Sequence, residues 1–281
     1  MTTYLNGKFL NLEDARVSIL DRGYLYGDGL FDTMIFHEGR PFEWSRHWSR
    51  LATGLKLLRI RIPQTESDLR EAATRLIQAR GLDFGVLRLH VSRGPGTPGY
   101  STKGCDAPTV AMTLHPSTHD PDSGPPTRTL HTARIRVPSG EFHACIKSAS
   151  KVSHVLARME AEDHSADEAL LLNDRGNVAE AASANVFWIA EGMVTTSPLR
   201  EGGLGGVTRA LVMEELAPGL GLRVGEREAT PDTLRGSQGV FLTMTTIGVV
   251  PVVSLDGQAL PIPDVMNDLY RAYWNRVRAM G

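Results

Sequence analysis

The sequence predicts an α+β fold made of two domains, and three observations lead to that prediction. Apolar residues recur at helical spacing in some stretches and in strand-like alternation in others, both before and after residue 115. The segment "HPSTHDPDSGPPTR" is rich in Pro, Ser, Asp and Gly and has no hydrophobic period. The chain has 281 residues, enough for two domains of ordinary size. We therefore expect a small N-terminal domain (1–115), a linker (116–128) and a larger C-terminal domain (129–281).

The N-terminal domain combines short strands with two helices. The stretch "LFDTMIFHEGRPFEW" (30–44) predicts a strand, a tight turn and a short return strand. Apolar residues at helical spacing over 45–60 predict one helix, and 65–81 predicts a second with Thr65 or Ser67 as its N-cap. The alternating stretches "VLRLHVS" and "TVAMTL" predict two further strands.

The C-terminal domain is predicted to be richer in strands. A strand over 129–136 precedes a helix that begins after Lys147, and 168–197 predicts a β-meander. A helix over "TRALVMEELA", strands over "GVFLTM" and "VVPVVSL", and a closing helix complete the domain. The apolar face of the helix after Lys147 comprises Val152, Val155, Leu156 and Met159, and that of the closing helix comprises Val265, Leu269, Tyr273 and Val277.

Composition and net charge argue against several classes of protein and several kinds of site. The net charge of −2 argues against a nucleic-acid or membrane-surface partner, and no apolar run approaches the ~18–20 residues of a membrane span. The N-terminus lacks the features of a signal peptide, and two cysteines, Cys105 and Cys145, cannot make a disulfide framework. His115 and His119 lie in a Pro-rich loop, so we expect no metal site there. These features predict a soluble, cytoplasmic globular protein.

A glycine-rich stretch precedes the helix "TRALVMEELA". Four of the five residues 202–206 are glycine, and Thr208 stands in the first turn of the helix. Backbone N–H groups at a helix N-terminus attract anions, so the stretch can bind a phosphate. It lacks the lysine of a Walker A loop and a clean dinucleotide fingerprint. A flexible loop capped by Thr208 remains the alternative on this stretch alone.

Two charged residues stand in apolar surroundings, and a third lies close to one of them. Glu180 lies in a run of alanine and valine, where a carboxylate needs a partner. That partner is either a structural cation or a cofactor nitrogen that must stay protonated. Lys147 follows an apolar pair, where a desolvated amine becomes nucleophilic, and Lys151 stands four residues later. The alternative is that both lysines are solvated on a helix.

Together these elements resemble the class-IV, fold-type IV pyridoxal-phosphate enzymes. That family contains branched-chain and D-amino-acid aminotransferases and 4-amino-4-deoxychorismate lyase. The matching stretches include "DRGYLYGDGLFDTM", "HWSRL", "RLHVSRGPGTPGYST", "IKSASKVSHVLARMEAEDHSADEALLLNDRGNVAEAASANVFW", "GGVTRALV" and "FLTMTTIGVVPV", and Glu180 follows Lys147 by 33 residues. The resemblance implies a small N-terminal α/β domain and a larger C-terminal domain with a β-barrel-like core.

The resemblance also implies a cofactor, pyridoxal 5′-phosphate, and a set of site residues. Lys147 matches the Schiff-base lysine that shuttles a proton between substrate and cofactor, and Glu180 matches the carboxylate that keeps the pyridine nitrogen protonated. The implied phosphate-binding residues are Arg50, Val207, Thr208 and Thr245, with Ser183 beside them. The implied substrate-pocket residues are Phe31, Thr33, Arg93, Tyr100 and Thr246.

By resemblance the chain is an aminotransferase that works as a homodimer. It would move an amino group between an apolar, branched-chain or aromatic amino acid and a 2-oxo acid. One alternative is the lyase, which releases pyruvate and 4-aminobenzoate, and another is a cofactor-binding protein without turnover. Pro98 stands where D-amino-acid enzymes and lyases commonly carry arginine, and Ser150 where both commonly carry asparagine. "ANVFW" and "GYST" favour the lyase, whereas "TMTTIGVVPV" is closer to the aminotransferases.

Overall fold

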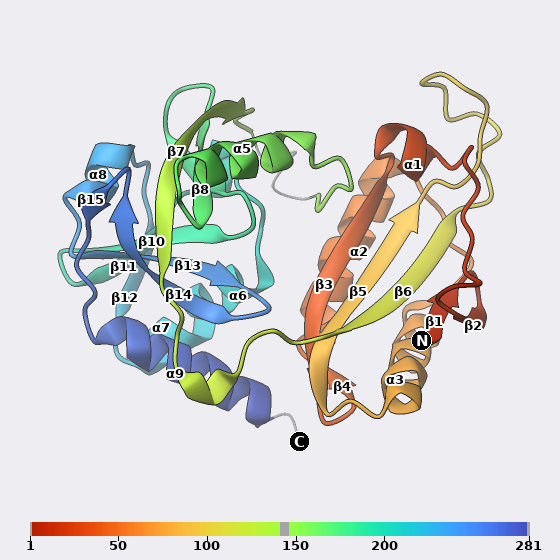
Figure 1. Ribbon diagram of the computed structural model, residues 1–281, viewed down its shortest axis with the longest axis horizontal. Coiled ribbons are helices and arrows are strands. Elements are labelled where there is room, and N and C mark those ends of the chain that lie inside the picture. Colours follow the sequence, from red (N-terminus) through yellow and green to blue (C-terminus); the bar gives the residue numbers. More distant parts are fainter. Residues whose placement is uncertain (1, 141–145, 280–281) are drawn as a thin grey trace. The chain divides into compact units, whose positions relative to one another are not determined.

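The computed structural model describes residues 2–140 and 146–279, which form two compact units (Figure 1). The first unit comprises the chain up to Thr118 together with Ile146–Lys151, and the second comprises the other described residues. The division after Thr118 falls inside the segment 116–128. The stretch that carries Lys147 returns to the N-terminal unit. None of the described helices combines the length and the apolar character that a bilayer span requires.

The first unit is built on a six-stranded antiparallel sheet. Its strands are β1 (Thr2–Leu5), β2 (Lys8–Asn11), β3 (Gly29–His37), β4 (Arg40–Pro41), β5 (Phe84–Ser92) and β6 (Thr109–Pro116). Their order across the sheet is β2-β1-β6-β5-β3-β4. In the pairing of β3 with β5, Phe31 lies opposite His90 and Thr33 lies opposite Arg88. These four side chains therefore share one face of the sheet.

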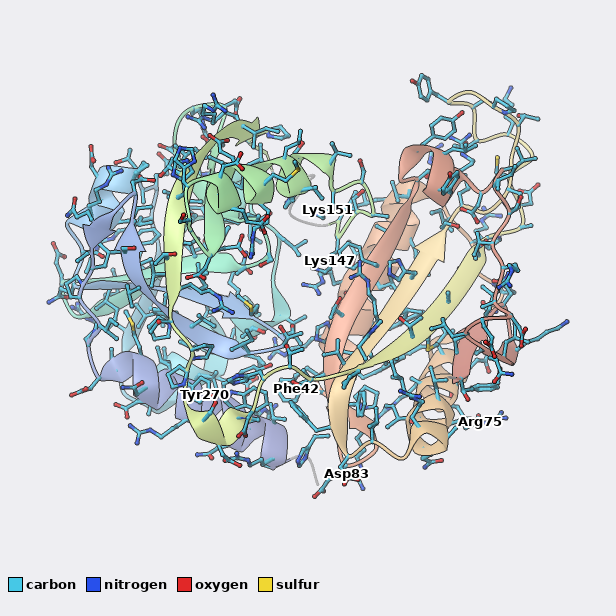
Figure 2. All side chains as sticks on the ribbon, viewed as in Figure 1. Phe42, Arg75, Asp83, Lys147, Lys151 and Tyr270 are labelled. Carbon is cyan, nitrogen blue, oxygen red and sulfur yellow. The ribbon has the colours of Figure 1, made fainter. Side chains whose placement is uncertain are left out.

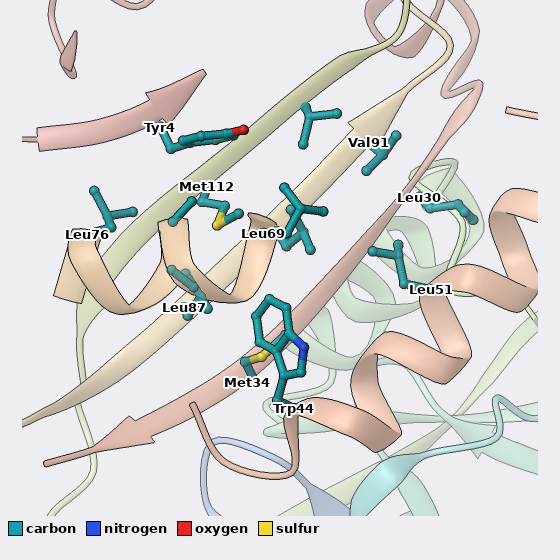
Figure 3. Packing of buried hydrophobic residues seen from close by; sticks show 14 of the residues in the cluster. Tyr4, Leu30, Met34, Trp44, Leu51, Leu69, Leu76, Leu87, Val91 and Met112 are labelled. Carbon is teal, nitrogen blue, oxygen red and sulfur yellow. The ribbon is translucent and has the colours of Figure 1, made fainter. Parts of the chain in front are cut away.

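Two helices cover the opposite face and enclose the core of this unit (Figure 3). They are α2 (Trp44–Leu58) and α3 (Glu66–Arg80), and the short α1 (Arg22–Tyr26) precedes β3. Helix α3 begins with a capping box between Thr65 and Asp68, which identifies Thr65 as the N-cap. Figure 3 shows Leu69, Leu76 and Leu87 packed between α3 and the sheet.

The second unit contains a nine-stranded sheet. Its strands are β7 (Arg128–Val137), β8 (Glu168–Asn173), β9 (Val178–Ala181), β10 (Asn185–Ala190), β11 (Met193–Thr196), β12 (Arg223–Glu226), β13 (Gly239–Met244), β14 (Gly248–Leu255) and β15 (Gln258–Ala259). The main path runs β12-β11-β10-β13-β14-β7-β8-β9, and β15 pairs with β14. The terminal strand β9 also packs against β10, so the sheet curls toward a barrel. This arrangement confirms the predicted α+β class and its barrel-like C-terminal core.

Within its described residues, the second unit contains the three predicted helices and three short helices that were not predicted. They are η1 (Pro121–Ser123), α5 (Val152–Asp163), η2 (Leu199–Glu201), α6 (Val207–Leu211), the π-helical η3 (Val212–Leu216), α7 (Ala217–Gly219), α8 (Pro231–Arg235) and α9 (Val265–Arg278). The consecutive α6, η3 and α7 form the helix predicted over "TRALVMEELA". In α9 the predicted residues Leu269, Tyr273 and Val277 are buried.

The helix predicted after Lys147 is α5. It begins at Val152, because the preceding residues are extended and pair with β3. Phe31 donates its backbone N–H to the Lys147 carbonyl at 3.0 Å, and Ala149 donates to the Gly29 carbonyl at 2.9 Å. The lysine is therefore fixed by strand pairing.

The predicted apolar face of α5 is not the face that packs on the sheet. Val152 and Met159 are 69% and 54% exposed, whereas Ala157 and Ala161 on another face are fully buried. Small side chains let the helix axis approach β7 and β8 closely, so the alanines face the core. The larger apolar residues consequently face outward.

Candidate active site

Lys147 is held beside the aromatic ring of Phe31. The two backbone hydrogen bonds to β3 fix the lysine main chain, and its Nζ lies 4.8 Å from the centre of the Phe31 ring. Figure 2 shows Lys147 and Lys151 in the segment that precedes α5. A cation over an aromatic face is electrostatically favourable. Lys151 lies directly before α5, beyond Ser148 and Ala149, the last residues of this segment that pair with β3. The structure therefore distinguishes the two lysines.

Two further residues surround the Phe31 ring, and the sequence patterns did not single them out. The Arg88 guanidinium carbon lies 4.4 Å from the ring centre, and the His90 ring stacks on Phe31 with centroids 5.6 Å apart. Arg88 Nε donates to His90 Nε2 at 2.6 Å. Burial, together with the positive charge of Arg88, lowers the pKa of His90 to about 4, so its neutral ring can accept that hydrogen bond.

Arg50 is buried against a carboxylate and is not a solvated helix arginine. Its Nη2 donates to Asp32 Oδ1 at 2.8 Å and its Nε donates to Asp32 Oδ2 at 3.1 Å. His47 Nδ1 lies 2.7 Å from the same Oδ1. Burial alone would raise the pKa of Asp32, but His47 and Arg50 outweigh it and hold that pKa well below its usual range. The bidentate ion pair fixes the guanidinium in one orientation.

Two predicted substrate residues occupy different environments. Arg93 is buried, donates to both carboxylate oxygens of Asp28 at 2.7 and 3.0 Å, and also donates to the Leu58 carbonyl at 2.9 Å. Its guanidinium thus ties together segments of the N-terminal unit. Tyr100 is 88% exposed, and its ring centroid lies 5.7 Å from that of Tyr26.

In the second unit, Glu180 on β9 is buried and has two polar neighbours. Its Oε2 accepts the backbone N–H of Leu204 at 2.8 Å, and its Oε1 lies 3.3 Å from His154 Nε2. Leu204 belongs to the glycine-rich stretch, so the carboxylate and this loop are directly connected. A carboxylate in apolar surroundings needs polar partners. For Glu180 these partners are a backbone amide and an imidazole.

The glycine-rich loop (202–206) packs closely against neighbouring residues just before α6. Asn185 Nδ2 donates to the Leu204 carbonyl at 2.7 Å, so Leu204 is fixed through both its N–H and its C=O. A Cβ on Gly206 would lie 2.0 Å from Asn185 Oδ1, and one on Gly203 would lie 2.7 Å from the Ala179 carbonyl. Only glycine allows this approach.

Three of the remaining predicted residues lie at the start of α6 or within contact of it. Val207 and Thr208 are its first two residues, and Thr208 Oγ1 lies 3.4 Å from Thr245 Oγ1. Tyr273 donates its hydroxyl to the Thr245 carbonyl at 2.6 Å, and Thr246 follows in the same turn. Ser183 donates to Glu168. The structure thus brings two threonine hydroxyls to a helix N-terminus.

The family model described as "Amino-transferase class IV" matches residues 29–255 of the chain. The chain belongs to this family. A putative branched-chain-amino-acid aminotransferase of Methanocaldococcus jannaschii is 33% identical over 266 residues, covering 92% of this chain and 90% of that one. The aminodeoxychorismate lyase of Bacillus subtilis is 30% identical over 258 residues, covering 90% and 86%.

Solved structures of two relatives give the same assignment. A branched-chain amino acid aminotransferase of T.th. complexed with N-(5′-phosphopyridoxyl)-L-glutamate matches with a TM-score of 0.91 at 27% identity, covering 100% of this chain and 95% of that one. The 4-amino-4-deoxychorismate lyase of Pseudomonas aeruginosa matches with a TM-score of 0.84 at 29% identity, covering 97% and 98%. Class-IV aminotransferases use pyridoxal 5′-phosphate, and this chain is an enzyme of that family.

The residues of this chain fit the cofactor. Lys147 supplies a primary amine, and Glu180 supplies a buried carboxylate. The start of α6 supplies bare backbone amides together with the hydroxyls of Thr208 and Thr245, a combination that suits a phosphate.

Replacing Gly206 with alanine should weaken cofactor binding. The new Cβ would displace the Asn185 side chain and release Leu204, so the loop before α6 would lose its fixed shape. We expect the dissociation constant for pyridoxal phosphate, measured by fluorescence, to rise about tenfold or more, as overpacking costs of ~1–3 kcal/mol imply. Gly219→Ala is the matched control, because nothing lies within 4 Å of its Cβ. Equal affinities in the two variants would contradict this role of the loop.

The sequence did contain signals for some of the residues that were not singled out. Asp32 shares the strand phase of Leu30 and Met34, which are buried, so a carboxylate there needs a buried partner. Arg88 and His90 alternate with the buried residues of β5, which places both on the opposite face. Within the described residues, no group of three His, Cys, Asp or Glu side chains is placed to hold a metal ion.

Proposed function

We propose that the protein is an aminotransferase that moves an amino group between an amino acid and a 2-oxo acid, with Lys147 as the reacting amine. The observation that carries this proposal is the fixed position of the Lys147 amine over Phe31, set by strand pairing with β3. A positioned amine can serve both as nucleophile and as general base. The 33% identity to the archaeal putative branched-chain aminotransferase supports the transaminase over other reactions of the family.

Each part of the chain has a separate task in this proposal. When bound, pyridoxal phosphate withdraws electrons from the substrate α-carbon. Lys147 Nζ would take the proton from that carbon and deliver it to the cofactor, as amino-group transfer requires. Glu180 keeps the pyridine nitrogen protonated by presenting a negative charge. By the family resemblance, Arg50, Val207, Thr208 and Thr245 would hold the phosphate.

Arg88 is our candidate for binding an anionic group of the substrate. Burial lowers the pKa of Arg88, which shows that its charge is poorly solvated. Among the residues that the structure describes, no carboxylate lies within ion-pair distance of it, and its side chain makes a hydrogen bond to His90 and a cation–ring contact with Phe31. A partly desolvated guanidinium without a counter-ion suits a carboxylate ligand. Phe31 beside it supplies an apolar surface for the remainder of an apolar or aromatic substrate.

A coupled assay tests this function against the lyase that the similarity to the Bacillus subtilis enzyme also favours. We expect 2-oxoglutarate-dependent turnover of branched-chain or aromatic amino acids. Pyruvate release from aminodeoxychorismate without an added oxo acid would establish the lyase instead. Within the assay, Arg88→Met should raise the KM for the oxo acid about tenfold, since a charged hydrogen bond contributes ~1.5–3 kcal/mol.

We also propose that the enzyme is a homodimer. Val152, Val155, Leu156 and Met159 form an exposed apolar stripe on α5, and a stripe of this kind commonly marks a protein interface. Light scattering should give about twice the chain mass of 30.7 kDa. A monomer at micromolar concentration would contradict the proposal.

A further inference from the structure

The Glu180 carboxylate is held from two sides by different segments of the chain. Its Oε2 accepts the Leu204 N–H at 2.8 Å, and its Oε1 lies 3.3 Å from His154 Nε2. The side chains of His154 and Glu180 are 19% and 9% exposed, so solvent screens their contact only weakly. Both oxygens therefore have a protein neighbour.

His154 reaches Glu180 from a helix that is itself fixed. It is the third residue of α5, and α5 packs on β7 and β8 through the fully buried Ala157 and Ala161. Movement of the helix would open a gap against the sheet, which is unfavourable in a packed interior. The imidazole is thus presented to β9 from a rigid element.

This arrangement restricts the rotation of the Glu180 carboxylate. The last torsion of a glutamate side chain has broad, shallow minima, so a free carboxylate samples many orientations. A partner at each oxygen removes that freedom. Each oxygen also has a second lone pair, so the carboxylate can still accept an N–H from another group.

We propose that His154 is a positioning residue that orients Glu180 toward the pyridine nitrogen of the cofactor. The proposal rests on the function proposed above for Glu180. Groups one layer behind a functional side chain commonly change activity by 10–100-fold when removed, because they orient the group in front. His154 would act in this way without contacting the substrate.

The test is the ¹⁵N chemical shift of the ring nitrogen in holoenzyme loaded with ¹⁵N-labelled pyridoxal phosphate. His154→Leu should move this shift toward that of an unprotonated nitrogen, and kcat should fall about tenfold. His154→Gln keeps a side-chain N–H donor and should restore both values most of the way. An unchanged shift in His154→Leu would overturn the proposal, even if thermal unfolding of the apoprotein showed a loss of stability.

Two controls separate this idea from the proposed function. Glu180→Gln should move the same ¹⁵N shift at least as far as His154→Leu, and no movement would overturn the role of Glu180 and the present proposal together. Movement in Glu180→Gln without movement in His154→Leu would overturn only the role of His154.

His164→Leu alters an exposed histidine that stacks on His131, and it should leave the shift unchanged. If His154→Leu does not fold, His154→Phe provides the same comparison with a ring of similar shape.

Discussion

Replacement of Lys147 by alanine is expected to abolish turnover, with kcat falling by at least about 10⁴-fold. Strand pairing fixes the Lys147 main chain, its amine lies 4.8 Å from the Phe31 ring centre, and a solvent molecule cannot replace a nucleophile and base held there. The protein should fold normally, because the stabilising contacts of this segment with β3 are made by its backbone. Single-turnover kinetics and the visible absorption of the bound cofactor measure the effect.

Lys151→Ala is the matched control for this experiment. Lys151 is the same residue type, four positions further along the chain, and it lies directly before α5, beyond the residues that pair with β3. We expect a kcat close to that of the unaltered enzyme. If the Lys151 variant were inactive and the Lys147 variant active, the assignment of the two lysines would be reversed.

Glu180→Gln is expected to lower kcat by about 10²–10³-fold, the effect of removing one preorganised electrostatic group. Glutamine has nearly the same shape and can still accept the Leu204 N–H, so the loop should keep its position. It carries no negative charge and therefore cannot keep the pyridine nitrogen protonated. The cofactor would then withdraw electrons less effectively, while the KM should change much less than kcat.

The control for charge removal is Glu162→Gln on α5. Glu162 is an exposed carboxylate of the same unit, paired with Arg158 at 2.9 Å. An exposed pair of this kind contributes ~0–1 kcal/mol to stability, so activity should be unaffected. If Glu180→Gln retained the kcat of Glu162→Gln, Glu180 would have a structural role only.

The local patterns of the sequence predicted most of the secondary structure, but not the long-range pairing. Strands β3 and β5 were both expected, yet two helices separate them in the chain. Which residue of one lies opposite which residue of the other therefore depends on tertiary packing. That register is what brings Arg88 and His90 to Phe31. The position of Lys147 likewise depends on pairing with a strand more than a hundred residues earlier.

Helix α5 shows a second limit of sequence patterns. Periodicity correctly predicted a helix and placed its larger apolar residues on one face, without showing which face is buried. The structure buries Ala157 and Ala161 instead, because small residues permit close packing on β7 and β8. Periodicity specifies which residues share a helix face. Which face is buried depends on the size of the space available beside the sheet.

The identity of the reacting amine is the central claim, and reductive trapping tests it most directly. The holoenzyme would be treated with borohydride, digested, and analysed by tandem mass spectrometry for the phosphopyridoxyl group. We expect this group on Lys147 and on no other lysine, because Lys147 is held by its backbone beside Phe31. Its appearance on Lys151, or on another lysine, would contradict the assignment of Lys147 as the reacting amine.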